Sequence, residues 1–261
     1  MAPARFGGRA LSSPSDLSAM IGWQLHDDIA ILTLERGGAR NAIPIAGWDT
    51  LAGAARALAT SDVRAVILRS AMPGVFSAGA DLAEFRDLVA DPALRIRVRE
   101  AMAAGIEGVA ALPMPVIAAV DGGCFGAAVA LTLACDIVVA GDEAVFATTP
   151  AKLGLTYPAS DVARLKARVG EGQAGLMLFT GARIDADEAA RTGLAHRRVA
   201  HARPSAHELA SAIAANVPEA VRALKSVLRD PSEAGHTQVF DDAFGSAAFS
   251  ARLHAFLEGK R

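Results

Sequence analysis

Two stretches decide how this chain folds: residues 73–85 read PGVFSAGADLAEF, and residues 118–136 read AAVDGGCFGAAVALTLACD. In each, an apolar strand-like run leads into a turn of small residues, and a helix-like run follows. Such a turn exposes backbone N–H groups at a helix N-terminus, where a ligand oxygen can reach them. Each stretch alone is also consistent with an ordinary strand-to-helix turn. Placed together, the two turns would aim two amides at one oxygen, the arrangement that stabilises an enolate.

The alternation of strand and helix continues on both sides of these turns. Repeated strand–helix units are typical of the α/β class, and the chain beyond Ser160 is mostly helical in pattern. A capped helix begins at Asp185. We predict strands at residues 29–34, 64–69, 116–120 and 137–140, and helices at residues 44–60, 94–111, 126–135, 185–192 and 241–260.

The composition excludes several classes of protein. The chain has 261 residues, of which 52% are hydrophobic and 21% charged, so it is long enough to bury a core and is not of disordered composition. Its net charge of −2 leaves no basic excess for binding nucleic acid. No apolar run is long enough to predict a membrane helix. We expect neither a nucleic-acid partner nor a membrane.

The cysteine content and the N-terminal residues indicate in which cellular compartment the protein is expected. Cys124 and Cys135 are the only cysteines, which favours a reducing compartment and the cytoplasm, with both thiols buried and inert. Residues 1–20 lack periodicity, and Asp16 is atypical of a targeting peptide, so we expect a disordered tail. No histidine or cysteine cluster has metal-ligand spacing, and no pattern for a redox cofactor accompanies the glycine-rich turns.

The motifs together resemble the crotonase superfamily, also called the enoyl-CoA hydratase/isomerase family. Besides the two turns, Arg40-Asn41-Ala42 resembles the early motif on the coenzyme A side, residues 179–199 resemble the helix and strand that follow, and residues 255–258 resemble the terminal helix. The resemblance spans roughly residues 29–261. It implies a ββα superhelix at residues 21–200, which binds acyl-CoA, and a helical region for trimerisation at residues 201–261. Homotrimers, commonly paired into hexamers, are the implied assembly.

The resemblance also assigns roles to single residues. The thioester oxygen would lie between the N–H groups of Ala80 and Ala127, although the family usually has glycine at the second position. The alanine methyl group narrows the approach but leaves the amide in place. Coenzyme A is implied only as part of the substrate. The other residues that the resemblance places at the substrate are Ala78, Leu82, Ala83, Gly126, Phe256 and Lys260.

The resemblance fails at the residues that hydration needs. Hydratases of the family use two glutamates, a base that activates water and an acid that protonates the α-carbon. In register with the second turn, the first glutamate position is Ala130. The family has Pro then Glu where this chain has Thr149 then Pro150, so the second position is Pro150. Standard two-glutamate hydration or isomerisation is therefore not supported, because the fold does not fix the reaction.

One segment favours a different reaction. Residues 146–158 read FATTPAKLGLTYP and resemble the methylmalonyl-CoA decarboxylase branch, in which a tyrosine at the position of Tyr157 contributes to the active site. Loss of CO2 leaves a thioester enolate, so an oxyanion hole does most of the work and no base removes a carbon-bound proton. Against this, the decarboxylases have a histidine at the position of Ala80. Tyr157 is also consistent with a loop tyrosine whose hydroxyl binds the backbone.

The sequence leaves alternatives to decarboxylation open. Asp161, four residues after Tyr157, and Glu84, one helical turn after the first small-residue turn, are acids that could replace the missing glutamates, although surface or capping charges also fit both. A non-standard enoyl-CoA hydratase or isomerase would need such an acid. A third alternative is an acyl-CoA-binding relative without activity. Decarboxylation of a malonyl-type acyl-CoA, with Ala80, Ala127 and Tyr157 in the site, is the preferred prediction.

Overall fold

The computed structural model describes residues 20–259. Lys260 and all but the last residue of the predicted tail lie outside these residues. The strands are β1 (Ile21–His26), β2 (Ile29–Leu34), β3 (Ala65–Ser70), β4 (Val75–Ser77), β5 (Val116–Val120), β6 (Gly123–Phe125), β7 (Ile137–Gly141), β8 (Val145–Ala147), β9 (Ile184–Asp185) and β10 (Arg197–Val199). The α-helices are α1 (Ile45–Ala59), α2 (Pro92–Ala110), α3 (Ala127–Leu133), α4 (Ala159–Thr180), α5 (Ala186–Thr192), α6 (Ala202–Ala214), α7 (Pro218–Arg229), α8 (His236–Phe244) and α9 (Ala247–Leu257). The 3₁₀ helices are η1 (Gly37–Ala39), η2 (Leu82–Val89) and η3 (Pro150–Leu153).

Within the described residues, the strands form two sheets. The larger sheet has the order β1-β2-β3-β5-β7-β10 and the smaller one β4-β6-β8-β9. Both are parallel except at the pairs β1–β2 and β8–β9. Successive strand pairs β3/β4, β5/β6 and β7/β8 each give one strand to either sheet before the chain enters the next helix. This arrangement is the ββα superhelix that the resemblance implied.

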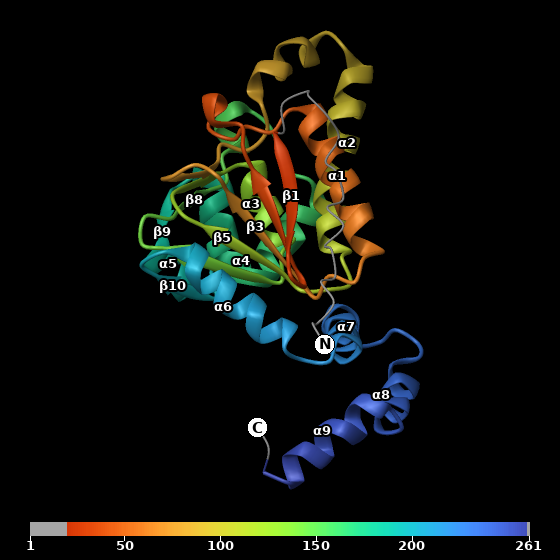
Figure 1. Cartoon of the computed structure of the whole chain (residues 1–261). Coiled ribbons are helices and arrows are strands. Elements are labelled where there is room, and N and C mark those ends of the chain that lie inside the picture. Colours follow the sequence, from red (N-terminus) through yellow and green to blue (C-terminus); the bar gives the residue numbers. More distant parts are fainter. Residues whose placement is uncertain (1–19, 260–261) are drawn as a thin grey trace, which may run out of the picture.

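The central strands form where the sequence offers short, continuous apolar runs. Every residue of β2 and of β5 is buried, as expected for parallel strands covered on both faces. Helices α1 and α2 pack against each other along one side of the sheet, and α6 covers the opposite face (Figure 1). The largest side chains that are fully buried include Trp48, Phe76 and Phe146. The predicted strands at 29–34 and 116–120 are confirmed to the residue.

Two predicted helices differ from the structure. The segment after Asp81 is the 3₁₀ helix η2, capped by the Asp81 carboxylate, which accepts from the Ala83 N–H at 3.0 Å. The predicted helix at 241–260 is wrong as a single element, because α8 ends at Phe244 and α9 begins at Ala247. The hydroxyl of Ser246 accepts from the Phe249 N–H at 3.1 Å, and this N-cap starts the second helix.

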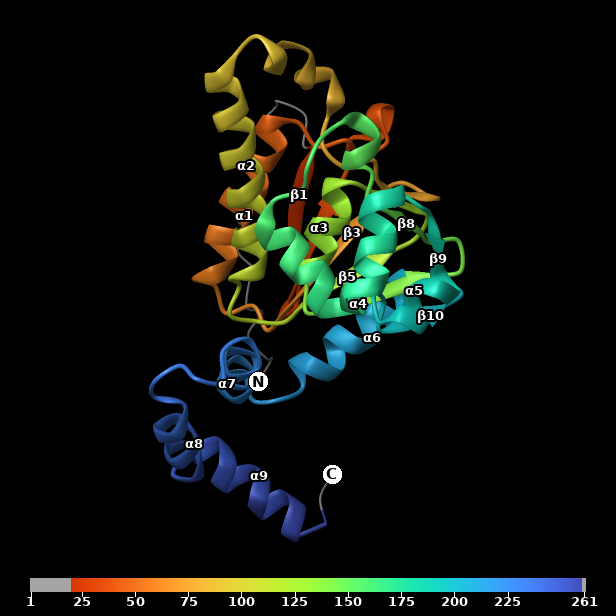
Figure 2. The same ribbon diagram turned by 180° about the vertical axis from the view of Figure 1, so that it is seen from behind.

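Helix α7 turns its charged face inward and its apolar face outward. Lys225 is only 5% exposed, donates to Met114 O at 2.7 Å and pairs with Asp136 at 2.5 Å. Arg222 and Arg229 also donate to carbonyl oxygens of the domain that holds the sheets. On the other side, Leu224 and Leu228 are exposed. Helices α7 to α9 extend away from that domain in both views (Figures 1 and 2).

The predicted environment of the two cysteines is confirmed. Both are free and buried, and burial is the main reason that the pKa of Cys135 is raised to about 12 and that of Cys124 well above its ordinary value. Thiols of this kind are held in the unreactive protonated form. No helix within residues 20–259 is long and apolar enough to cross a membrane.

Candidate functional site

The two turns singled out in the sequence meet in the structure. The first follows β4 and the second follows β6, and these neighbouring strands are paired in parallel. At Gly79 φ is +91°, and a Cβ atom there would lie 2.5 Å from Phe125 O and 3.1 Å from Ala127 N. Only glycine adopts this backbone conformation readily and leaves room for such an approach. The backbone of the first turn therefore touches the backbone of the second.

The hydrogen bonds around Ala80 set the direction of its amide. Ile43 N–H donates to Gly79 O at 2.7 Å, and Asp81 N–H donates to Ile43 O at 3.0 Å. In this parallel bridge Ala80 is the residue whose own N–H and C=O point away from Ile43. Ala127 is the first residue of α3, where the N–H has no partner within the helix. Within residues 20–259 neither the Ala80 nor the Ala127 N–H donates a hydrogen bond.

The two positions of the family glutamates hold no acid. Ala130 lies in α3 and is 1% exposed, so its methyl group is packed in the core. Pro150 begins η3, next to Thr149. Neither side chain has a group that exchanges protons, so neither residue can act as a water-activating base. The chain thus has the two turns of the family but lacks the pair of glutamates that hydratases use as acid and base.

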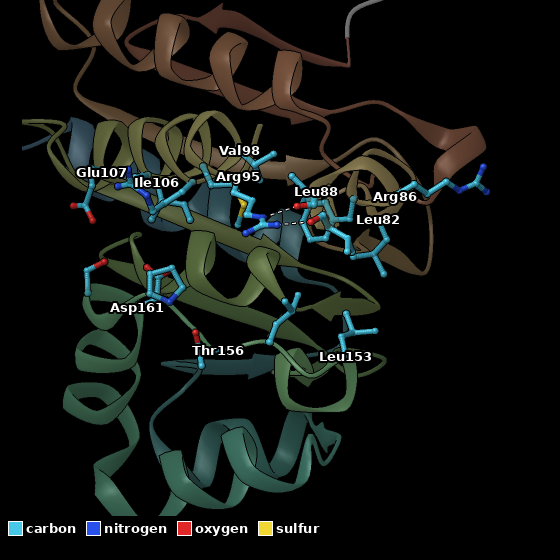
Figure 3. A pocket seen from close by; sticks show the side chains of 18 residues that line it. Leu82, Arg86, Leu88, Arg95, Val98, Ile106, Glu107, Leu153, Thr156 and Asp161 are labelled. Atoms are coloured by element: carbon cyan, nitrogen blue, oxygen red, sulfur yellow. Dashed lines mark hydrogen bonds between the residues drawn. The ribbon is translucent and has the colours of Figure 1, made fainter. Parts of the chain in front are cut away.

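A cavity of about 980 Å³ lies next to η2, which follows the first turn. Ala80, Ala127 and Tyr157 do not line it. Leu82, two residues after Ala80, lines it, as do Thr156 and Pro158 on either side of Tyr157. Its wall is mainly apolar, with Glu107 and Asp161 at one end and Leu82 and Leu153 toward the other (Figure 3). The remaining lining residues are Phe85, Arg86, Leu88, Val89, Arg95, Val98, Arg99, Met102, Ala103, Ile106, Leu155 and Ser160.

Most of one cavity wall comes from α2, which the sequence analysis predicted as a helix without placing it at the site. Its lining positions 95, 98, 99, 102 and 106 recur at the three- and four-residue spacing of one helix face. This periodicity is visible in the sequence and indicates which side chains share one face of α2. The sequence does not show that this face lies opposite the loop at residues 153–158, because the two segments meet only in the folded chain.

Tyr157 has a backbone partner. Its hydroxyl donates to Gly126 O at 2.5 Å, which ties the loop before α4 to the second turn. Burial, then the negative charge of Asp161, raises the pKa of Tyr157 well above its ordinary value. The phenol therefore stays protonated and offers no phenolate to act as a base, and its O–H is already used in holding the carbonyl next to Ala127. This is the backbone-bound arrangement left open by the sequence.

We expect Tyr157→Phe to lower turnover only modestly. Loss of one intramolecular hydrogen bond costs about 1 kcal/mol, which corresponds to a rate change of about fivefold if it is felt in the transition state. A hydroxyl that transferred a proton would instead contribute about 10²–10⁴-fold. Steady-state kinetics on the accepted acyl-CoA, with calorimetric measurement of its affinity, separates these cases. A loss beyond 100-fold at unchanged affinity would give Tyr157 a direct chemical role.

The two substitute acids have different environments. Glu84 accepts from the Ile45 N–H at 2.7 Å and thereby caps α1, so the capping interpretation is confirmed for Glu84. Asp161 is 3% exposed and lines the cavity, so a surface charge is the wrong description of it. It does not cap α4 either, because no backbone N–H of that helix end donates to its carboxyl group. Burial raises the pKa of Asp161, the positive charge of Arg164 opposes this, and Glu107 adds to it.

Only some of the other residues predicted to contact the substrate lie at the cavity or at the two turns. Leu82 lines the cavity, whereas Ala78, in the first turn, and Ala83, in η2, do not. Gly126 joins the second turn to Tyr157 through its carbonyl. Phe256 lies on α9, which both overall views place far from α2, the helix that lines the cavity (Figures 1 and 2). Its ring is exposed.

Comparison with known proteins agrees with this geometry. The family model for enoyl-CoA hydratase/isomerase matches residues 24–258. The chain is 31% identical over 252 residues to the short-chain-enoyl-CoA hydratase of Clostridium acetobutylicum, covering 89% of this chain and 92% of that one. It is 32% identical over 232 residues to the "Probable enoyl-CoA hydratase echA6" of Mycobacterium bovis, covering 87% and 91%.

A solved structure gives the same result. A crystal structure of an enoyl-CoA hydratase/isomerase family protein from Hyphomonas neptunium superimposes with a TM-score of 0.88 at 32% identity, covering 92% of this chain and 95% of that one. Such similarity over nearly the whole length extends to the fold and to the family. This chain is a member of the enoyl-CoA hydratase/isomerase family of the crotonase superfamily.

Proposed function

We propose that the chain binds an acyl-CoA thioester, stabilises its enolate between the amides of Ala80 and Ala127, and releases CO2 from a malonyl-type acyl group. The observation that carries this proposal is the contact between the two turns at Gly79, next to two N–H groups that have no acceptor among residues 20–259. Preorganised amides of this kind are most effective where negative charge develops on oxygen. The proposed reaction needs no group beyond the coenzyme A of the substrate.

Decarboxylation fits the residues that are missing. The bond between the α-carbon and the carboxylate breaks, its electron pair enters the thioester enolate, and CO2 leaves. The α-carbon then takes up one proton. No base is needed to remove a carbon-bound proton, which agrees with alanine and proline at positions 130 and 150. Hydration by the standard pair would require acids at both positions.

The test is a mixed panel of thioesters analysed by mass spectrometry. Malonyl-, methylmalonyl- and ethylmalonyl-CoA are incubated with the protein beside crotonyl-CoA and longer enoyl-CoAs. Loss of CO2 from a malonyl-type thioester is the expected result. Addition of water to an enoyl-CoA would replace the proposal with a non-standard hydratase, and a shifted double bond would replace it with an isomerase. Tight binding of the whole panel without any product would identify a relative without activity.

We further propose that the chain assembles as a homotrimer or homohexamer through helices α7 to α9. Helix α7 uses its cationic face to attach to its own domain, so its leucine-bearing face is left uncovered. A concentration of exposed apolar side chains on neighbouring helices is typical of an interface with another chain. The exposed apolar side chains of this region are Leu224, Val227, Leu228, Val239, Phe240, Phe244, Phe249, Leu253, Phe256 and Leu257.

Leu228→Glu is expected to weaken this assembly. Leu228 is 85% exposed in the single chain, so a charge there costs little until a second copy covers it. Light scattering after size-exclusion chromatography should give three or six times the mass of one chain for the unaltered protein and a lower mass for the variant. Phe179→Glu, at a similarly exposed position on α4, is the control. A single-chain mass for the unaltered protein would contradict the proposal.

A further inference from the structure

Asp161 is a buried acid in the wall of the cavity. It lies in the first turn of α4, where its N–H donates to Pro158 O at 3.0 Å, and its side chain is 4% exposed. Of the acids along the cavity wall, Glu107 is about half exposed and pairs with Arg164 at 2.5 Å. Figure 3 shows Glu107 and Asp161 at the same end of the cavity. Asp161 is thus the buried carboxyl group of the site.

Structural needs do not account for this burial. The one hydrogen bond that the carboxyl group accepts from residues 20–259 comes from Arg164 at 3.4 Å, the long limit for such a bond. Buried carboxylates that serve the fold usually accept several short hydrogen bonds. Even Asp81, which is only partly buried, accepts from Arg36 at 2.6 Å and from the Ala83 N–H at 3.0 Å. Asp161 instead keeps most of its acceptor capacity free.

The environment of Asp161 favours its protonated form. Burial is the main cause of its raised pKa, and the Glu107 charge acts in the same direction against Arg164. A carboxylic acid of this kind is suited to donate a proton at a pH where an exposed aspartate is already ionised. Glu84 and Asp81, the acids next to the first turn, are not available in this way, since each is engaged with a backbone N–H.

A short path connects Asp161 with the second turn. Tyr157 lies four residues before Asp161, in the loop before α4, and donates to Gly126 O. Gly126 directly precedes Ala127. The Asp161 carboxyl group and the Tyr157 hydroxyl are close enough to interact electrostatically. Asp161 is thus linked, through Tyr157, to the carbonyl that precedes the amide of Ala127.

We propose that the carboxyl group of Asp161 delivers the proton that the α-carbon of the enolate takes up, in place of the family glutamates. This rests on the proposed enolate chemistry. The O–H bond of the carboxylic acid breaks, its proton forms the new bond to the α-carbon, and the enolate returns to a thioester. The Asp161 carboxylate regains its proton from water. In the reverse direction the same carboxylate removes an α-proton from a saturated acyl-CoA.

The test uses propionyl-CoA in ²H₂O, because α-deuterium exchange measures proton transfer without requiring release of CO2. The unaltered protein should exchange an α-proton, and Asp161→Asn should slow the exchange by about 100-fold or more. Asp161→Glu keeps an acid and should restore part of the rate. Glu171→Gln changes an exposed acid of the same helix and should match the unaltered protein. Calorimetry with propionyl-CoA checks that each variant still binds.

Methylmalonyl-CoA in ²H₂O supplies a second readout. The unaltered protein should give propionyl-CoA with deuterium in one configuration, whereas Asp161→Asn should give both configurations, because water then protonates the enolate. Equal exchange rates and equal stereochemistry in the two proteins would overturn the role of Asp161. Absence of exchange in the unaltered protein would also overturn it, even if CO2 is released. Exchange that depends on Asp161 without release of CO2 would support this role and refute decarboxylation.

Discussion

Gly79→Ala is expected to reduce the turnover of the accepted acyl-CoA by about 10²–10³-fold, the loss usually caused by removing one donor of an oxyanion hole. The new methyl group would lie 2.5 Å from Phe125 O and 3.1 Å from Ala127 N, so the two turns must separate. Separation moves the Ala80 amide away from the Ala127 amide. Both would then no longer reach the same oxygen.

The matched control for this variant is Gly74→Ala. Gly74 also has a positive φ, +68°, but a Cβ atom there meets no atom within 4 Å. Both variants carry the backbone cost of alanine in the left-handed region, about 1–2 kcal/mol, and only Gly79→Ala adds the collision. Thermal unfolding reports the shared cost, and steady-state kinetics reports the difference. If the two variants retain equal turnover, the paired amides are not the catalytic device.

Lys225→Met is expected to lower the free energy of unfolding by about 3–5 kcal/mol, because it leaves a partly buried charge without its partner. The ammonium group donates to Met114 O and pairs with Asp136, whose carboxylate also accepts from the Val116 N–H at 2.7 Å. The same contacts attach α7 to the sheet domain. Urea unfolding followed by circular dichroism measures the loss.

Two further variants serve as controls for the loss of stability in Lys225→Met. Lys166→Met removes an exposed lysine that pairs with Glu171, and a surface pair of this kind contributes at most about 1 kcal/mol. The double variant Lys225→Met, Asp136→Asn removes both charges and should recover part of the stability, since no unpaired carboxylate remains. A loss for Lys225→Met no larger than that for Lys166→Met would show that the pair does not stabilise the attachment of α7.

The local elements were predictable where neighbouring residues encode them. The apolar run at residues 29–34 is β2, and the run at 116–120 is β5, because a buried parallel strand is a short apolar segment between turn residues. The cap at Asp185 is confirmed too, since its carboxylate accepts from the Glu188 N–H three residues on. The break between α8 and α9 was missed because a serine cap inside a helical pattern is a weak signal.

The site was predictable only as a set of segments. The sequence by itself determined the alternation of strand and helix, the two glycine turns and the absence of acids at positions 130 and 150, because these follow from residue types along the chain. The ββα superhelix was implied by the resemblance to the family. The tertiary structure decided which groups are free to act. Glu84 caps a helix 39 residues away, the Tyr157 hydroxyl binds Gly126 O, and Asp161 becomes buried facing the cavity. These outcomes depend on hydrogen bonds and burial between distant segments, which spacing along the chain does not encode.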